Sequence, residues 1–249
     1  MDERGAAAAS HERTTGAPDC LSGGRFCSMM MPHRRGCSTQ PPAKRNPRCL
    51  PALSDMPPLS RHLQRRRLSK IREYVRGAVL DLGCGDASLR AWLGPNQTYT
   101  GVETRADIVR DLQQSDLPHR FIAADLDVDD LTLEPGAYDT IVMSAIIEHL
   151  RSPARALGGL PRLLALNGRL VITTPTRLGD VVHRLGAVIG LFSREAEKEH
   201  QRIFDRGSLE RLLRECGFVS EHYETFDFGL NQLCVAVPEA RRGEQGRPP

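Results

Sequence analysis

The residues best suited to chemistry in this sequence form the pattern Asp81-x-Gly83-x-Gly85, which follows directly on a short apolar run. Glycine allows a positive φ and places no side chain between the backbone and a bound ligand. In an open α/β sheet, a turn of this kind lies at the carboxyl end of a central strand, where ligands bind. The pattern therefore predicts a binding site for a nucleoside-like cofactor.

Acidic residues also end the next two predicted strands. Glu103 closes the alternating run 99–103, and Asp125 lies near the end of the apolar run 121–126. An acid about twenty residues beyond the glycine turn accepts hydrogen bonds from a ribose in dinucleotide-binding folds. Two acids and a glycine turn at one edge of a sheet favour a bound nucleoside over a simple tight turn.

The spacing of the glycines separates two kinds of nucleoside cofactor. The dinucleotide fingerprint G-x-G-x-x-G requires a third glycine, and that position is Ser88. The pattern Asp81-x-Gly83-x-Gly85 instead resembles motif I of the class I S-adenosylmethionine (SAM)-dependent methyltransferases, although Ala87 stands where that family usually has glycine. The resemblance implies SAM as the cofactor, bound by Asp81, Gly83, Gly85, Glu103, Asp125, Leu126 and Ser144.

The same resemblance implies a role for each acid. Asp81 would orient the glycine turn and reach the amino group of the cofactor. Glu103 would hold the ribose hydroxyls, and Asp125 with Leu126 would contact the adenine. The resemblance covers roughly residues 70 to 237.

The remaining runs predict the rest of a sheet. Residues 138–144 and 167–175 are expected to form a fourth and a fifth strand. Two further strand-like runs, 219–228 and 231–237, flank Gly229 and predict a closing hairpin. We therefore expect an α/β fold: a Rossmann-like, doubly wound, mostly parallel seven-stranded sheet with an antiparallel last strand and helices on both faces.

Two helical segments lie between the fifth strand and the hairpin. Ser208 is a suitable N-cap for a helix that stops at Gly217. Residues 176–198 carry apolar side chains at helical spacing. They are expected either to pack on the sheet or to form a lid over an apolar acceptor.

Two histidines are candidate general bases. If the acceptor is a hydroxyl, a base helps by removing its proton, and imidazole titrates near neutral pH. His149 belongs to an E-H-L segment after the fourth strand that resembles small-molecule methyltransferases, and His200 lies where that family covers the acceptor. In the related quinone-pathway O-methyltransferases an acid–acid–histidine set here binds a divalent metal. Ala145 replaces the first acid, so we predict no metal.

Composition divides the chain into three parts. Residues 1–57 are rich in Gly, Pro, Ser and Arg without periodicity, which predicts a disordered tail. The natural start could also lie at Met29 to Met31 or at Met56. We expect one methyltransferase domain over residues 58–238 and a second disordered tail over 239–249.

Charge and cysteine content limit the partners and the compartment. Residues 61–76 hold seven basic side chains against Glu73, whereas residues 77–249 hold 19 basic and 25 acidic side chains, a net charge of −6. We interpret the basic segment as a solvated helix face rather than a nucleic-acid track, and expect a small-molecule acceptor. The seven cysteines lack C-x-x-C spacing, and no apolar run is long enough to cross a bilayer. A reducing cytoplasm is the expected location.

Three functions remain open on this evidence. The first is a SAM-dependent methyltransferase for a small molecule, lipid or glycan intermediate, with oxygen as the favoured acceptor atom. The second is a catalytically silent protein of the same fold that serves as a binding partner or scaffold. The third is an NAD-dependent oxidoreductase, which Ser88 and the closing hairpin disfavour.

Overall fold

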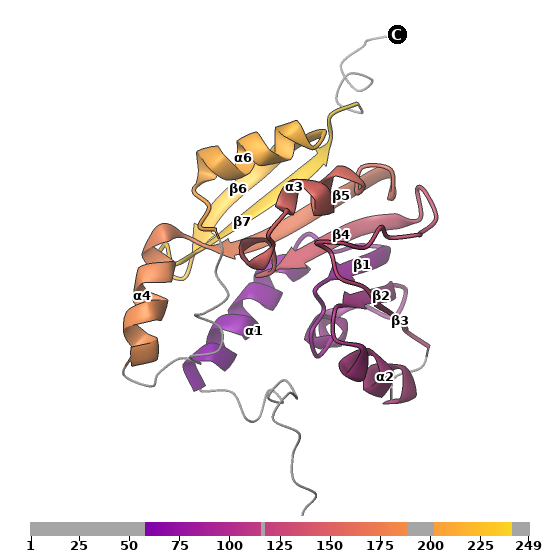
Figure 1. Cartoon of the computed structure of the whole chain (residues 1–249), viewed down its shortest axis with the longest axis horizontal. Coiled ribbons are helices and arrows are strands. Elements are labelled where there is room, and N and C mark those ends of the chain that lie inside the picture. Colours follow the sequence, from indigo (N-terminus) through magenta and orange to yellow (C-terminus); the bar gives the residue numbers. More distant parts are fainter. Residues whose placement is uncertain (1–57, 116–117, 189–201, 241–249) are drawn as a thin grey trace, which may run out of the picture. The chain divides into compact units, whose positions relative to one another are not determined.

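The computed structural model describes residues 58–115, 118–188 and 202–240, which form one sheet with helices on both faces (Figure 1). The strands are β1 (Ala78–Leu82), β2 (Thr98–Glu103), β3 (Arg120–Ala123), β4 (Tyr138–Ser144), β5 (Leu164–Pro175), β6 (Phe218–Phe226) and β7 (Asn231–Pro238). The helices are α1 (Pro58–Arg72), α2 (Ala106–Ser115), α3 (Pro153–Gly158), α4 (Arg177–Val188), α6 (Arg206–Glu215) and the 3-10 turns η1 (Ser88–Trp92) and η2 (Ile147–His149). The first predicted tail and most of the second lie outside the described residues.

The seven strands lie in the order β3-β2-β1-β4-β5-β7-β6. Strands β1 to β5 pair in parallel, whereas β7 is antiparallel to both of its neighbours, β5 and β6. The order reverses between β1 and β4, so the carboxyl ends of these two central strands flank the switch point where ligands bind in such sheets. The predicted fold and its reversed last strand are confirmed.

The core consists of two apolar clusters, one on each face of the sheet. Leu80 and Leu82 of β1 belong to one cluster, and Val79 belongs to the other, as the alternation of a strand requires. The first cluster includes side chains of α3 and α6, and the second includes side chains of α1 and α2. Because β1 is covered on both faces, its carboxyl end is the part left to face a ligand.

Two strands differ from their predicted bounds. Strand β3 ends at Ala123, so Asp125 lies in the loop beyond it rather than in the strand. Strand β5 begins at Leu164, three residues before the predicted start, and a bulge interrupts its pairing with β4. The carboxyl end of β5 is as predicted, at Pro175, whereas the carboxyl end of β3 lies earlier than predicted.

Helix α6 begins earlier than the sequence suggested. Its N-cap is Asp205, whose Oδ1 accepts a hydrogen bond from the Ser208 backbone N–H at 2.8 Å. The Ser208 hydroxyl is in turn bonded to the Asp205 backbone N–H at 2.9 Å, which completes a capping box. The prediction of Ser208 as the N-cap was therefore wrong by three residues, because aspartate and serine are both good caps and only the backbone distinguishes them.

Replacing Asp205 with Ala should destabilise the protein by about 1 kcal/mol, because the first turn of α6 loses its capping acceptor. Urea unfolding followed by circular dichroism measures the change. Asp205→Asn is the matched control, since the amide oxygen still caps the helix. Equal losses in the two variants would show that the charge, and not the cap, is what matters.

Helix α4 does not bury its apolar residues against the sheet in the part whose side chains are described. Leu178 is 55% exposed and Val181 is 52% exposed, whereas Gly179 and Asp180 are buried. The interpretation of this segment as a helix packed through its apolar stripe is therefore wrong for these two residues, and the lid stays a prediction. No helix in the described part of the chain has the length and apolar character that crossing a membrane requires.

Candidate functional site

The glycine turn after β1 has the conformation that its sequence demands. Gly83 has φ +73° and Gly85 has φ +54°, both in the left-handed region. The N–H groups of Gly83 and Cys84 donate to the Val102 carbonyl at 2.8 and 3.0 Å, which joins the turn to β2. A Cβ on Gly83 would lie 2.6 Å from Cγ1 of Ile146, in the loop after β4. Glycine at this position thus lets the turn and the β4 loop meet.

Ala87 also lies in the left-handed region, with φ +56°, and is fully buried. A non-glycine residue there carries a strain of roughly 1–2 kcal/mol. This is the position at which the related family usually has glycine, so the backbone of the turn is retained although the residue differs. Retained backbone at a strained position is consistent with a functional turn.

Glu103 at the end of β2 holds the glycine turn. Its Oε2 accepts a hydrogen bond from the Gly85 N–H at 3.1 Å, and its Oε1 accepts one from the Arg105 N–H at 3.1 Å. The sequence had assigned the orientation of the turn to Asp81, whereas the described contacts place this bond on Glu103. A carboxylate bonded once on each oxygen still has lone pairs for a ribose diol.

Asp81 lies near the carboxyl end of the neighbouring strand β1 and is bonded to a different partner. The Tyr99 hydroxyl donates to Oδ2 of Asp81 at 2.7 Å, and both side chains are buried. Burial raises the pKa of Asp81 to about 7, the Tyr99 hydrogen bond opposes the rise, and the charges of Asp86 and Glu103 add to it. A carboxylate in these surroundings favours a cationic ligand, because a positive charge offsets both the burial and the like charges.

The loop after β3 forms the next part of this edge. Asp125 Oδ1 accepts a hydrogen bond from the Asp127 N–H at 2.9 Å, while the Ala124 N–H donates to the Glu103 carbonyl at 3.1 Å. Leu126 is buried in the core beside it. Asp125 and Leu126 are therefore held next to the end of β2. A nucleoside whose ribose lay at Glu103 would meet these two residues next.

The end of β4 completes the edge. Ser144 is the last residue of β4, and its Oγ lies 3.4 Å from the Thr173 hydroxyl of β5. Ala145 follows with φ +52° and donates its N–H to the Thr173 carbonyl at 2.8 Å. The left-handed conformation of Ala145 changes the direction of the chain at the carboxyl edge of the sheet. The turn η2, which contains His149, follows directly after it.

A buried acid that the sequence did not single out lies in the same turn. Glu148 is only 2% exposed, and its Oε2 accepts a hydrogen bond from the Thr174 hydroxyl at 2.9 Å. His149, the next residue, is half-buried. The E-H-L segment thus places an acid under the end of β5 and a histidine at the carboxyl edge.

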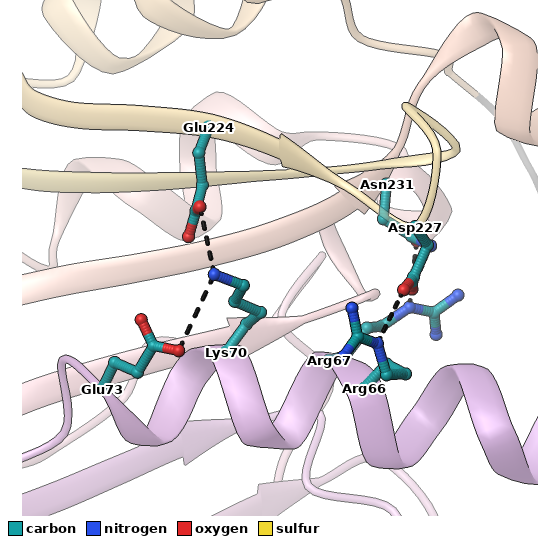
Figure 2. A network of polar contacts seen from close by, with 7 residues as sticks. All are labelled: Arg66, Arg67, Lys70, Glu73, Glu224, Asp227 and Asn231. Atoms are coloured by element: carbon teal, nitrogen blue, oxygen red, sulfur yellow. Dashed lines mark hydrogen bonds and ion pairs between the residues drawn. The ribbon is translucent and has the colours of Figure 1, made fainter.

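Helix α1 is joined to the hairpin of β6 and β7 by ion pairs, which Figure 2 shows. Arg66 Nε lies 2.9 Å from Asp227 Oδ1, and Lys70 Nζ lies 3.2 Å from Glu224 Oε2. Pairs of this exposure contribute roughly 0–1 kcal/mol each. The expectation of a solvated basic face was therefore incomplete, because two of its cations face the hairpin.

Arg67 reaches from α1 to the carboxyl edge of the sheet. Its Nε donates to Oδ1 of Asn231 at 3.2 Å, and Asn231 pairs with Pro175, the last residue of β5 (Figure 2). Burial lowers the pKa of Arg67, while the charges of Glu148 and Asp227 oppose that change. The carboxyl edge near the end of β5 thus contains a cation and a buried acid from different elements.

The structure therefore gathers the predicted cofactor residues along the carboxyl ends of β1, β2, β3 and β4. His149 lies at the same edge, whereas His200 lies outside the described residues. Sequence reasoning missed Tyr99, Glu148 and Arg67. Only the β1–β2 register could have indicated Tyr99. Tyr99 pairs with Val79, so its side chain lies on the same face of the sheet as that of Asp81.

Comparison with known proteins identifies the family. The model of a family described as a methyltransferase domain matches residues 58–223. A malonyl-[acyl-carrier protein] O-methyltransferase of Paenibacillus sp. (strain JDR-2) is 23% identical over 152 residues, which cover 56% of this chain and 54% of that relative. The chain thus spans about half the length of this curated relative.

Solved structures agree on the fold. Magnesium protoporphyrin IX methyltransferase from Synechocystis PCC 6803, solved with bound S-adenosylhomocysteine (SAH), has a TM-score of 0.54 at 19% identity, over 72% of this chain and 84% of that one. A [4+2]-cyclase has a TM-score of 0.54 at 16% identity, over 70% and 80%. With the family match over residues 58–223 and a sheet closed by the reversed β7, the chain belongs to the class I SAM-dependent methyltransferases.

Proposed function

We propose that this protein transfers the methyl group of SAM to an acceptor held at the carboxyl edge of β4 and β5. The observation that carries the proposal is the arrangement of Glu103, which binds the Gly85 N–H at 3.1 Å while it ends the strand beside Asp81. The glycine turn, Glu103 and the buried Asp81 lie together at the switch point of the sheet, where a nucleoside ligand would bind.

The residues present fit SAM. Glu103 is suited to accept hydrogen bonds from the ribose hydroxyls, and Asp81 is suited to pair with the cationic amino group. Gly83 and Gly85 leave the backbone of the turn open to the ligand, since neither carries a Cβ. Asp125 and Leu126 are proposed to contact the adenine, and Ser144, the last residue of β4, is proposed to lie next to the reacting centre.

The sulfonium of SAM supplies a methyl group that is already activated. The chain then has to hold the acceptor atom in line with it and to keep water away. Holding two reactants in line is worth up to roughly 7–11 kcal/mol in favourable models. Where the acceptor is a hydroxyl, a base near η2 would receive its proton, and His149 is the described residue proposed for that role.

We propose a small molecule, lipid or glycan intermediate as the acceptor, with methylation on oxygen. The Paenibacillus relative, named as an O-methyltransferase, supports oxygen as the acceptor atom. A screen of cell extracts with methyl-labelled SAM identifies the compound that gains the label. Label on nitrogen or carbon alone would reject the O-methylation.

Replacing His149 with Ala should lower kcat/KM about 10²- to 10⁴-fold if its imidazole removes the acceptor proton. SAH affinity should stay unchanged, because His149 is proposed to act on the acceptor and not on the cofactor. His222→Ala is the matched control, since His222 lies within β6, outside the proposed site. An unchanged kcat/KM for His149→Ala would remove this residue from the mechanism.

Replacing Glu103 with Ala should weaken SAH binding by about 2 kcal/mol or more, roughly 30-fold, because two charge-assisted hydrogen bonds to the ribose are lost. Isothermal titration calorimetry measures the loss. Asp107→Ala is the matched control: Asp107 is an exposed acid on α2, paired with Arg105 at 3.2 Å. The proposed site would be wrong if both variants bound SAH as tightly as the wild type.

Two rival functions have distinct outcomes in the same calorimeter. Titration with NAD tests the oxidoreductase, and binding of NAD but not SAH would establish it in place of methyl transfer. A protein that binds SAH but labels nothing in extracts would be a catalytically silent member of the fold. The [4+2]-cyclase among the structural neighbours is named for a reaction other than methyl transfer, which is the reason to test methyl transfer directly with labelled SAM.

A further inference from the structure

Tyr99 is the one described side chain that donates a hydrogen bond to Asp81. Its hydroxyl lies 2.7 Å from Oδ2, and within the described part of the chain Oδ1 accepts no hydrogen bond. The bond therefore fixes one oxygen of the carboxylate and leaves the other for a ligand.

The tyrosine ring is itself held in place. It lies edge-on to Phe121, with ring centroids 5.9 Å apart, and edge-on to His119 at 5.7 Å. The side chain is only 3% exposed. A hydroxyl on a packed ring is a rigid donor, so the carboxylate that it bonds loses rotational freedom as well.

The charges around Asp81 make its ionisation depend on the hydrogen bond from Tyr99. The neighbouring groups from the glycine turn and β2 are Asp86, Cys84 and Glu103, and the described residues bring no basic side chain to Asp81. Burial and the two like charges favour the protonated carboxyl group, whereas the Tyr99 hydroxyl favours the charged carboxylate. Tyr99 thus opposes every other group that acts on Asp81.

We propose that Tyr99 is a positioning residue for cofactor binding: its hydroxyl holds the Asp81 carboxylate charged and aimed at the amino group of SAM. The inference rests on the proposed function. Under this proposal, the buried Tyr99 side chain of β2 determines the pH range in which the cofactor binds.

The test is the pH dependence of SAH binding, measured by calorimetry between about pH 5.5 and about pH 9. In the wild type, affinity should fall as the pH drops through about 7, because Asp81 becomes protonated. Tyr99→Phe should move the midpoint of this profile upward by about one unit, so that binding is roughly five- to tenfold weaker at pH 6 to 7 and the gap narrows at pH 9.

Tyr138→Phe is the matched control, because Tyr138 is a buried tyrosine at the opposite end of β4, at the start of that strand. His119→Gln is the second control, since it changes the packing against the Tyr99 ring but keeps the Tyr99 hydroxyl. Both controls should keep the wild-type midpoint. Thermal unfolding of each variant establishes that the fold is retained.

Three results would overturn the role of Tyr99. A Tyr99→Phe profile that is lowered equally at every pH, with the wild-type midpoint, indicates a structural contribution only. An unchanged profile indicates none, and a shift caused equally by His119→Gln assigns the dependence to the histidine. If the wild type binds no SAH at any pH, the proposed function itself fails, and this role fails with it.

Discussion

Replacing Asp81 with Asn should stabilise the ligand-free protein by up to about 4 kcal/mol near neutral pH and above, and should at the same time abolish tight cofactor binding. The folded protein raises the pKa of Asp81 from 3.8 to about 7. Between about pH 4 and about pH 7, a carboxyl group of this kind holds its proton in the folded state and has lost it in the unfolded state. Stability therefore falls as the pH rises from about 4 to about 7 and is constant above it.

Asparagine removes this penalty and keeps an oxygen to accept the Tyr99 hydrogen bond. The gain in melting temperature should accordingly grow between about pH 4 and about pH 7 and stay constant above, which differential scanning calorimetry measures. SAH affinity, measured in parallel, should fall because the amino group of the ligand loses its counter-charge. Asp107→Asn is the control, since Asp107 is an acid on α2 paired with Arg105 and is not among the groups that act on Asp81.

A gain in stability that did not change with pH would contradict this account of Asp81. Unchanged SAH binding by Asp81→Asn would also contradict it, since the buried charge would then not be needed to bind the ligand. The combination of higher stability and lost binding is the mark of a charge retained for function.

Replacing Gly83 with Ala should destabilise the protein by about 3 kcal/mol and prevent SAH binding. Two effects add. A residue with a Cβ at φ +73° is strained by roughly 1–2 kcal/mol. The new methyl group would also lie 2.6 Å from Ile146, so the loop after β4 has to move away from the turn.

Gly136→Ala separates the two effects. Gly136 has a similar φ, +68°, but a Cβ there would meet nothing closer than the Leu164 carbonyl at 4.0 Å. This variant should lose only the backbone contribution, about 1 kcal/mol, and should bind SAH normally. Urea unfolding of both variants gives the difference.

The contact with Ile146 can be tested by a double-mutant cycle. Ile146→Ala makes room for the new methyl group, so the double variant should recover about 1 kcal/mol or more relative to additivity. Additive effects, or equal losses in the Gly83 and Gly136 variants, would mean that the turn and the β4 loop do not meet as described.

Part of this protein follows from its sequence alone. The glycine turn after β1, the acids at the ends of the next strands and the closing hairpin are patterns of residues close together in the sequence. Strand alternation and glycine conformation are properties of the chain at short range, so they indicate the fold and the edge where a ligand binds.

The contacts that make the edge a site were decided by the tertiary structure. Glu103 holds the turn 18 residues before it, Tyr99 bonds Asp81 across two strands, and Arg67 reaches Asn231 164 residues away. The end of β3, the cap of α6 and the exposed apolar residues of α4 were also set this way. Strand register and helix placement bring these partners together, and the energy of a hydrogen bond or a buried charge depends on surroundings that no local pattern contains.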